Sequence, residues 1–374
     1  MRVKATLRKS VYILAVLIAA GLLAAGQDSE FNSRHHTLIA DQFNNRVIEV
    51  DRTGKIVWQF GLGPTDFSPA SIIGTNDAQR VGELTLMAGT GTPGGQPEAP
   101  DCTNPNGCPD NRVILVDRAG NIIWQYGTFG PGGSGPDQLN VPVQNTWLPN
   151  AHVLITDQAN ERIIEVDLAK NIVWQYGTTG VSGNGPNQLN NPNCAELLKN
   201  GHILICDENN NRALEVKRTL PLGGDIVWQY GSGDPNNNNP VSGVAFASRL
   251  ENGHTLITDS NHSRIVEIDG SKRVVWEYFT CTGSGCNLAR GTGPLPTRAV
   301  RLKNGHTLIS DQYNHRVIEV NHGKNIVRTF GKLGALGYNA ESVADGGLNS
   351  PYDAKRIGDY TGLTPPFFDD FGDH

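Results

Sequence analysis

The chain repeats one stretch of sequence, and its clearest copy runs from Asn304 to Gly331. This copy, NGHTLISDQYNHRVIEVNHGKNIVRTFG, contains three runs of β-branched and aromatic residues separated by turns rich in Asn, Gly and Asp. A fourth apolar run, Thr297 to Leu302, precedes it, and Lys303-Asn304-Gly305 joins the two with the residues that a tight hairpin needs. Each unit is therefore expected to form a four-stranded antiparallel meander.

Copies of this unit fill nearly the whole chain. Thr37 to Gly61 reads TLIADQFNNRVIEVDRTGKIVWQFG and Val153 to Gly177 reads VLITDQANERIIEVDLAKNIVWQYG, while further copies begin near Leu84, Ile203 and Thr255. Repeats of roughly 40 to 50 residues with four strands each are typical of β-propellers. The sequence therefore predicts an all-β fold, a six-bladed β-propeller of four-stranded antiparallel blades.

The first blade begins at Thr37 with its second strand, so its innermost strand has to come from elsewhere. Leu348 to Asp359, LNSPYDAKRIGD, matches Leu189 to Asn200, LNNPNCAELLKN, which opens blade 4. We therefore expect the C-terminal strand to join blade 1 and close the ring, which leaves no sheet edge open. On this interpretation residues 27–359 form the propeller. Residues 360–374 form a tail that is either frayed or held against the propeller by its phenylalanines.

Residues 1–26 have the pattern of a secretory signal peptide: four basic residues, the apolar run VYILAVLIAAGLLAA, and small residues before Gln27. An uncleaved anchor is the alternative. Cleavage would change the formal net charge from −6 to −10, because the leader holds four basic residues and no acid. An acidic domain without a basic stripe binds nucleic acid or anionic membranes poorly. We therefore predict a secreted or periplasmic protein without a nucleic-acid partner and without membrane insertion after cleavage.

The six cysteines form three close pairs, which favours local disulfides in an oxidising compartment. Two pairs bracket short loops, and the third lies on the two arms of the hairpin that turns at Lys199-Asn200-Gly201. A metal site is the alternative, but companion histidines and the Cys-x2-Cys spacing are missing. The predicted disulfides are Cys102–Cys108, Cys194–Cys206 and Cys281–Cys286.

A charged motif, Asp-x4-Arg-x2-Glu, recurs in five copies. The Asp ends one strand and the Arg begins the next, so a local ion pair that closes the turn is expected rather than a catalytic group. The copies are Asp41/Arg46/Glu49, Asp157/Arg162/Glu165, Asp207/Arg212/Glu215, Asp259/Arg264/Glu267 and Asp311/Arg316/Glu319. Blade 2 departs from the pattern with Gly89 and with the insertion GTPGGQPEAPDCTNPNGCPD, a loop that could carry function or be a tolerated decoration.

Histidines and tryptophans also recur once per blade. Equivalent residues on different blades lie far apart around a disc, so the histidines are not expected to share a metal ion. The tryptophans are expected to pack in the outer strands, and blade 6 has Arg328 in their place. The histidines are His36, His152, His202, His254 and His306, and the tryptophans are Trp58, Trp124, Trp174, Trp228 and Trp276.

We expect function where the blades differ, on the innermost strands that line a propeller's central channel. The second and fourth residues after the start of each such strand are Ser71/Ile73, Gln144/Thr146, Cys194/Glu196, Phe246/Ser248, Arg298/Val300 and Asp353/Lys355. The candidate ligand-binding residues are Gln144, Trp147, Glu196, Arg298, Asp353 and Lys355. Two structural alternatives are that the charges neutralise one another between blades, and that Trp147 packs in the core instead of offering a stacking surface.

The connectors GxxGxxGxGPxQLNxP, followed by an inner strand, NGH, an Asp-ended strand and NxRVIEV, resemble the NHL-repeat family of six-bladed propellers over residues 37–359. The blade pattern NxRVIEV…GxIVWQYG is also similar to propellers of the secreted arylsulfotransferase group. The NHL resemblance implies a binding platform, as in many members. Its relatives include an amidating lyase with zinc-bound histidines and lactonase-like hydrolases with a central divalent cation. No histidine falls in an innermost strand here, which argues against the zinc chemistry.

Each repeated polar motif has a structural explanation, and no nucleophile–base pair or metal constellation is left over. The sequence therefore favours a non-catalytic platform that binds a protein or glycan partner without a cofactor. The alternative is a metal-dependent hydrolase or lyase, lactonase-like, with its site in the central channel. There Glu196 and Asp353 could each give a carboxylate to a cation such as calcium, although Arg298 and Lys355 would oppose it. A redox-cofactor propeller is a third possibility.

Overall fold

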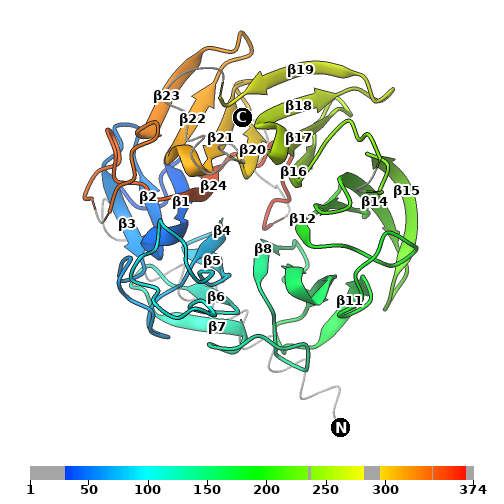
Figure 1. The fold of residues 1–374 in the computed structure, drawn as a ribbon, viewed down its shortest axis with the longest axis horizontal. Helices are drawn as coiled ribbons and strands as arrows, with labels where there is room; N and C mark the ends of the chain where they lie inside the picture. The colour runs from blue at the N-terminus through cyan, green and yellow to red at the C-terminus, as the bar shows by residue number, and fades with distance from the viewer. Residues whose placement is uncertain (1–29, 235–236, 282–294, 339, 368–374) are drawn as a thin grey trace.

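The computed structural model of this protein describes residues 30–234, 237–281, 295–338 and 340–367. Six four-stranded antiparallel sheets stand around a common centre as the blades of a disc (Figure 1), which confirms the predicted six-bladed propeller. Within these ranges no helix is long and apolar enough to cross a membrane. The predicted signal peptide, residues 1–26, lies outside the described residues.

Each blade runs from an innermost strand at the centre to an outermost strand at the rim. Blade 1 consists of β24 (Pro351–Arg356), β1 (Thr37–Asp41), β2 (Arg46–Val50) and β3 (Ile56–Phe60), and blade 2 of β4 (Thr75–Val81), β5 (Leu84–Gly89), β6 (Arg112–Val116) and β7 (Ile122–Gly127). Blade 3 consists of β8 (Pro142–Trp147), β9 (Val153–Asp157), β10 (Arg162–Val166) and β11 (Ile172–Tyr176), and blade 4 of β12 (Pro192–Leu197), β13 (Ile203–Asp207), β14 (Arg212–Arg218) and β15 (Gly224–Tyr230). Blade 5 consists of β16 (Val244–Arg249), β17 (Thr255–Asp259), β18 (Arg264–Ile268) and β19 (Val274–Phe279), and blade 6 of β20 (Arg298–Arg301), β21 (Thr307–Asp311), β22 (Arg316–Val320) and β23 (Ile326–Gly331). Short 3-10 helices follow four of the second strands: η1 (Gln42–Asn44), η2 (Gln158–Asn160), η3 (Ser260–His262) and η4 (Gln312–Asn314).

The ring closes as the sequence predicts. Strand β24 pairs antiparallel with β1, so that Thr37 lies opposite Arg356 and Ala40 lies opposite Asp353. Blade 1 is thus assembled from both ends of the propeller sequence, and its inner sheet edge is occupied.

The innermost strand of blade 2 differs from the prediction. Strand β4 begins at Thr75, and its register with β5 brings Asp77 and Gln79 to the channel in place of Ser71 and Ile73. Those two residues lie in the preceding connector, where both are buried. No proline opens β4, so counting from the nearest proline in the sequence gave the wrong starting point.

An apolar cluster fills each junction between neighbouring blades. At the junction of blades 2 and 3, for example, Trp124 and Tyr126 pack with Trp147 and Ile155. Each sheet therefore buries both of its faces, and this explains why the apolar runs of the repeat do not alternate strictly with polar residues.

The repeated Asp and Arg form the predicted ion pairs between the end of the second strand and the start of the third, and all of these side chains are buried except that of Arg264, which is 20% exposed. Arg46 Nε lies 2.9 Å from Asp41 Oδ2, and the corresponding distance is 2.7 Å in the four other copies. In four copies the second Asp oxygen accepts a backbone N–H from the connector to the innermost strand, as in Asn140 N to Asp157 Oδ1 at 2.8 Å. These carboxylates therefore hold the blades' turns together.

Blade 2 rebuilds this turn with a residue of its insertion. Arg112 Nε lies 2.5 Å from Asp110 Oδ1, and the other Asp110 oxygen accepts the Ile73 N–H at 2.8 Å. A Cβ on Gly89 would lie 2.4 Å from the Asp110 carboxylate, so the glycine makes room for the substitute acid. Part of the insertion is therefore structural.

The repeated His and Glu also pair, a contact that the sequence analysis missed. In each of the five copies His Nδ1 lies 2.6–2.8 Å from a Glu oxygen, as between His152 and Glu165 at 2.6 Å. An arginine from the neighbouring blade binds the second oxygen, as Arg218 does at 2.6 Å from Glu165. The histidines are therefore separate structural groups, as predicted.

Two of the predicted disulfides are present. Cys102 and Cys108 close a loop of the blade 2 insertion, and Cys194 and Cys206 link opposite residues of β12 and β13. Cys286 lies outside the described residues, so its pairing with Cys281 stays a prediction. Disulfides of this kind are typical of proteins in oxidising compartments outside the cytoplasm.

Candidate functional site

The structure brings five of the six predicted site residues to the central channel and adds a sixth residue that the sequence analysis missed. Gln144, Glu196, Arg298, Asp353 and Lys355 lie on the innermost strands of blades 3, 4, 6 and 1. Asp77 joins them from β4 of blade 2. The sequence analysis placed the inner strand of blade 2 too early in the chain. Starting that strand at Thr75 instead would have put Asp77 at the position of Gln144 in blade 3.

Trp147 does not belong to this group. Its side chain is 2% exposed and packs in the cluster between blades 2 and 3, which confirms the core alternative. It ends β8 at the position that Arg356, Arg80, Arg249 and Arg301 hold at or near the ends of four other inner strands. Its backbone N–H donates to Gln79 Oε1 at 2.6 Å, so Trp147 links two blades through its main chain as well.

Two acids and two bases form a closed ion-pair cluster in the channel. Arg298 contacts Asp77 at 2.7 Å and Asp353 at 2.6 Å, while Lys355 contacts the same two carboxylates at 2.5 and 2.6 Å. The Arg298 guanidinium also lies 4.1 Å from the centre of the Phe246 ring. Two positive and two negative groups thus balance one another, as the structural alternative predicted.

The pKa shifts of the two carboxyls reflect this arrangement. Burial raises the pKa of Asp77 against the opposing effects of Lys355 and Arg298. Burial also acts on Asp353, but there the Arg298 and Lys355 cations outweigh it and lower the pKa. Asp77 and Asp353 each contact both Arg298 and Lys355, so the two negative and two positive groups of the cluster are equal in number.

Glu196 is held separately, by amide and hydroxyl donors. Gln144 Nε2 donates to Glu196 Oε1 at 2.8 Å, and the backbone N–H and hydroxyl of Thr364 donate to Oε2 at 2.9 and 2.6 Å. Burial raises the pKa of Glu196, and the Thr364 hydrogen bonds act against this. Glu196 and Asp353 therefore both have partners already, and neither carboxylate is turned toward a shared site.

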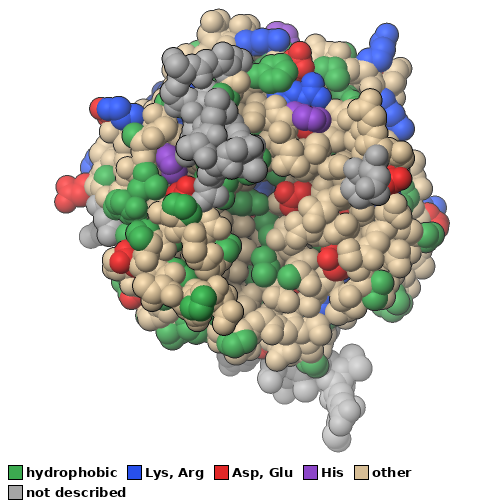
Figure 2. Space-filling model, viewed as in Figure 1, with side chains coloured by type: hydrophobic (Ala, Val, Ile, Leu, Met, Phe, Trp, Pro, Cys, Tyr) green, Lys and Arg blue, Asp and Glu red, His purple; other side chains and the backbone are tan. Residues whose placement is uncertain are grey.

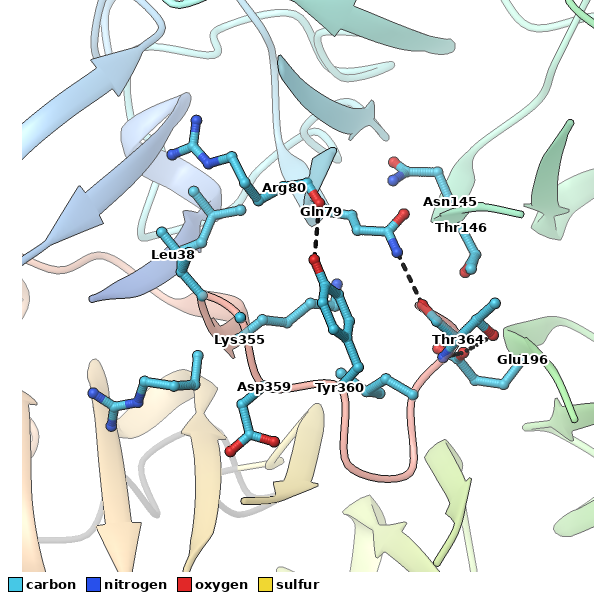
Figure 3. A pocket seen from close by; sticks show the side chains of 14 residues that line it. Leu38, Gln79, Arg80, Asn145, Thr146, Glu196, Lys355, Asp359, Tyr360 and Thr364 are labelled. Carbon is cyan, nitrogen blue, oxygen red and sulfur yellow. Dashed lines mark hydrogen bonds between the residues drawn. The ribbon is translucent and has the colours of Figure 1, made fainter. Parts of the chain in front are cut away.

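The donor Thr364 comes from the C-terminal tail, which enters the channel and closes one end of it (Figure 3). Gln79 Nε2 donates to the Thr364 carbonyl at 3.2 Å, and Tyr360 Oη donates to the Arg80 carbonyl at 3.4 Å. Leu363 packs on the cluster between blades 4 and 5. The tail is thus held by Tyr360, Leu363 and Thr364. Of its three phenylalanines Phe367 is 50% exposed, and the other two lie outside the described residues, so their predicted contact with the propeller stays a prediction.

The space that remains beside the tail is small. The cavity between the tail and Glu196, Lys355 and Gln79 has a volume of about 20 Å³. A cavity needs roughly 10–15 Å³ to hold one water molecule, so this one has room for little more than that. The tail end of the channel therefore offers no space for a substrate in this conformation.

The opposite end of the channel carries a different polar group. Asn193 and Asn191 donate their side-chain amides to Glu208 Oε2 at 2.8 and 3.1 Å, and Asn193 also donates to the Tyr352 hydroxyl at 3.0 Å. These residues lie at the starts of β12 and β24 and just after β13, whereas the tail contacts the far ends of β12 and β4. Glu208 and Tyr352 remain partly exposed.

Burial raises the pKa of Glu208 to about 7, and the two asparagine hydrogen bonds only partly oppose this shift. Glu208 replaces the glutamine that follows the repeated Asp in three other blades, as in Gln42, Gln158 and Gln312. The sequence therefore contained a signal for this residue, a single acid at a position where the other copies are neutral. Viewed face-on, the disc is hollowed at its middle, with hydrophobic and acidic side chains around the hollow (Figure 2).

A metal centre finds no support in the arrangement of side chains. Across the described ranges, no three His, Cys, Asp or Glu side chains gather closely enough to hold a metal ion. The repeated histidines bind glutamates of their own blades, and the channel carboxylates bind Arg298, Lys355, Gln144 and Thr364.

Comparisons with known proteins agree on the fold. The sequence matches no protein-family model, and no curated protein matches it. A crystal structure of a protein of unknown function from Bacteroides caccae is similar, with 16% identity and a TM-score of 0.52 over 79% of this chain and 93% of that chain. A streptogramin B lyase structure is similar with 13% identity and a TM-score of 0.51 over 90% of this chain and 89% of that one. At these identities the likeness extends to the propeller fold alone, and the chain is a six-bladed propeller similar to both.

Proposed function

We propose that this protein is a secreted or periplasmic binding propeller, without catalytic activity of its own. It would recognise a partner through the end of the channel that Asn191, Asn193, Glu208 and Tyr352 form, called here the Glu208 mouth. This proposal rests on one observation: the charged side chains inside the channel already form ion pairs with one another or accept hydrogen bonds from the tail. Arg298 and Lys355 neutralise Asp77 and Asp353, and Thr364 occupies Glu196. The resemblance of the blades to NHL repeats supports a binding role.

The mouth at Glu208 favours a glycan over a protein as the partner. The carboxylate of Glu208, the amide of Asn191 and the phenol of Tyr352 are partly exposed, with the buried Asn193 amide behind them, and groups of these kinds exchange hydrogen bonds with sugar hydroxyls. Small-molecule sites commonly place a few such convergent polar groups in a concave surface. A protein partner docking on the same face remains the second form of the proposal.

The alternative is a lactonase-like hydrolase or lyase with a metal ion bound by Glu196 and Asp353. The ion pairs and hydrogen bonds of these two carboxylates count against it, because a cation would have to displace Lys355, Arg298 and Thr364. The similar fold of the streptogramin B lyase structure does not transfer its reaction to this chain.

A glycan array followed by calorimetry tests the proposal. Binding of a defined oligosaccharide is expected to fall at least tenfold in Glu208→Ala and Asn193→Ala, and to be unchanged in Asn209→Ala, an exposed neighbour of Glu208. Metal analysis of the purified protein provides the second test. One divalent ion per chain, lost on replacing Glu196 or Asp353, would refute the proposal in favour of the metal-dependent enzyme.

A further inference from the structure

A groove of about 620 Å³ lies between blades 6 and 1. Its lining holds four basic side chains, Arg52, Lys303, Arg328 and Arg356, and two carboxylates, Glu319 and Asp359, among others. Its volume is within the range of small-molecule sites. One departure from the repeat lies in this lining, because Arg328 stands where each of the five other blades has a tryptophan.

The tryptophans show what normally fills this space. At the junction of blades 5 and 6, Trp276 is 6% exposed, donates its indole N–H to the His322 carbonyl at 3.0 Å, and lies 5.3 Å below the Arg301 guanidinium. The same stacking of arginine on indole joins three other pairs of neighbouring blades, at 4.7 to 5.8 Å. An indole ring beneath an arginine is therefore the ordinary filling of a junction in this protein.

Arg328 reproduces only part of that arrangement. Its Nη1 donates to the Arg52 carbonyl at 2.6 Å, in the same way as the Trp276 indole N–H donates to a carbonyl of the next blade. However, a linear side chain cannot occupy the volume of a bicyclic ring, and the Arg328 side chain stays 28% exposed. The space of the ring is left as the groove.

The exchange also changes the charge of the junction. Arg356 takes the place at which Arg301 covers Trp276, but it meets another guanidinium instead of an indole. Burial lowers the pKa of Arg356, Glu319 opposes this shift, and repulsion from Arg328 and Arg52 adds to it. Glu319 lies 2.8 Å from Arg356 and 3.6 Å from Arg328 while it also binds His306 at 2.7 Å. One carboxylate is thus shared among three basic side chains.

We propose that this groove binds a small aromatic carboxylic acid. Its ring would occupy the space that an indole fills at the other junctions, beneath Arg356, and its carboxylate would meet Arg328 and Arg52. An anion alone would leave the ring space empty, and a neutral aromatic ring would leave the excess of basic over acidic side chains in the groove uncompensated. This site is separate from the Glu208 mouth and does not depend on the proposed function.

Titration calorimetry with indole-3-acetate as the probe tests the proposal, with the neutral alcohol indole-3-ethanol and with inorganic sulfate as comparisons. The wild-type protein is expected to bind indole-3-acetate at least tenfold more tightly than either comparison compound. Equal binding of the acid and the alcohol, tighter binding of sulfate, or no binding of the acid at millimolar concentration would each overturn the proposal.

Variants locate the binding. Arg328→Trp restores the residue of the other blades and should therefore fold, with a thermal midpoint at or above that of the wild type, while it loses at least tenfold in affinity. Arg52→Ala should weaken binding several-fold, whereas Arg273→Ala, which removes a 79% exposed arginine of blade 5, should not change it. Retained affinity in a folded Arg328→Trp protein would refute the site. Glycan binding at the Glu208 mouth should be the same in all three variants, so the two proposals can fail separately.

Discussion

Replacing Glu208 by glutamine should stabilise the protein at alkaline pH and have little effect in acid. The carboxyl is partly buried beside Asn191 and Asn193, and its pKa is about 7, compared with an ordinary glutamate value of about 4.3. Glutamine has the same shape, keeps an oxygen for the asparagine amides to donate to, and does not ionise. The change therefore removes the titration and leaves the packing in place.

The sign of the effect follows from proton binding. Between about pH 4.3 and pH 7 the unfolded chain has released the Glu208 proton while the folded chain retains it, so the free energy of unfolding falls as pH rises. The loss is complete above pH 7. At about 1.36 kcal/mol per pKa unit it amounts to at most about 3.7 kcal/mol, and the partial exposure of Glu208 makes this an upper value.

Urea denaturation followed by tryptophan fluorescence at pH 5 and pH 8 measures the difference. The advantage of Glu208→Gln over the wild type should be about 2 to 3 kcal/mol larger at pH 8 than at pH 5. Glu251→Gln, which changes a 77% exposed glutamate, serves as the control and should show no such change between the two pH values. An advantage of the Glu208 variant that is the same at both pH values would show that the carboxyl titrates normally, and the reasoning from its burial would be refuted.

Three further replacements test the structural roles of other residues. Thr364→Val removes the hydroxyl that donates a hydrogen bond to Glu196 and should lower the free energy of unfolding, measured with urea, by about 1–3 kcal/mol. An unchanged midpoint would mean that the tail does not stay in the channel. Asp110→Ala leaves the Arg112 guanidinium buried without its acid and should cost about 3–5 kcal/mol, whereas Asp101→Ala, at an exposed position of the same insertion, should cost little. Replacing Cys194 and Cys206 together by alanine opens a link between residues 12 apart in the sequence and should lower stability by about 3 kcal/mol, as measured by thermal unfolding under conditions in which the wild-type disulfide stays oxidised.

The repetition of the sequence made the fold predictable. The match of Leu348–Asp359 to Leu189–Asn200 was enough to place β24 beside β1, because equivalent residues of a repeat occupy equivalent positions in the ring. The same counting brought Arg298, Asp353 and Lys355 to the channel correctly. It failed for Asp77, where β4 lacks the opening proline that the count relied on.

The remaining features have no second copy to compare. The tail occurs once, so nothing in the sequence indicated that Thr364 would bind Glu196 inside the channel. The sequence shows that Arg328 replaces a tryptophan, but it does not show that a groove lies beside Arg328. The groove depends on how the side chains of blades 6 and 1 fill the space between the two sheets. The partners of a charge also depend on distances across blades, which a linear sequence does not contain.

The pairing of β24 with β1 has a consequence for how the protein acquires its structure. Strand β1 is synthesised some three hundred residues before its partner, and until then it presents bare N–H and C=O groups on which another chain could assemble. Blades 2 to 6 can form from neighbouring segments as they emerge, but blade 1 has to wait. Thr364 lies beyond β24 in the sequence, so the tail can enter the channel only after β24 has been made. A folding intermediate in which blades 2 to 6 are formed and blade 1 is not should therefore have a channel that is open at both ends.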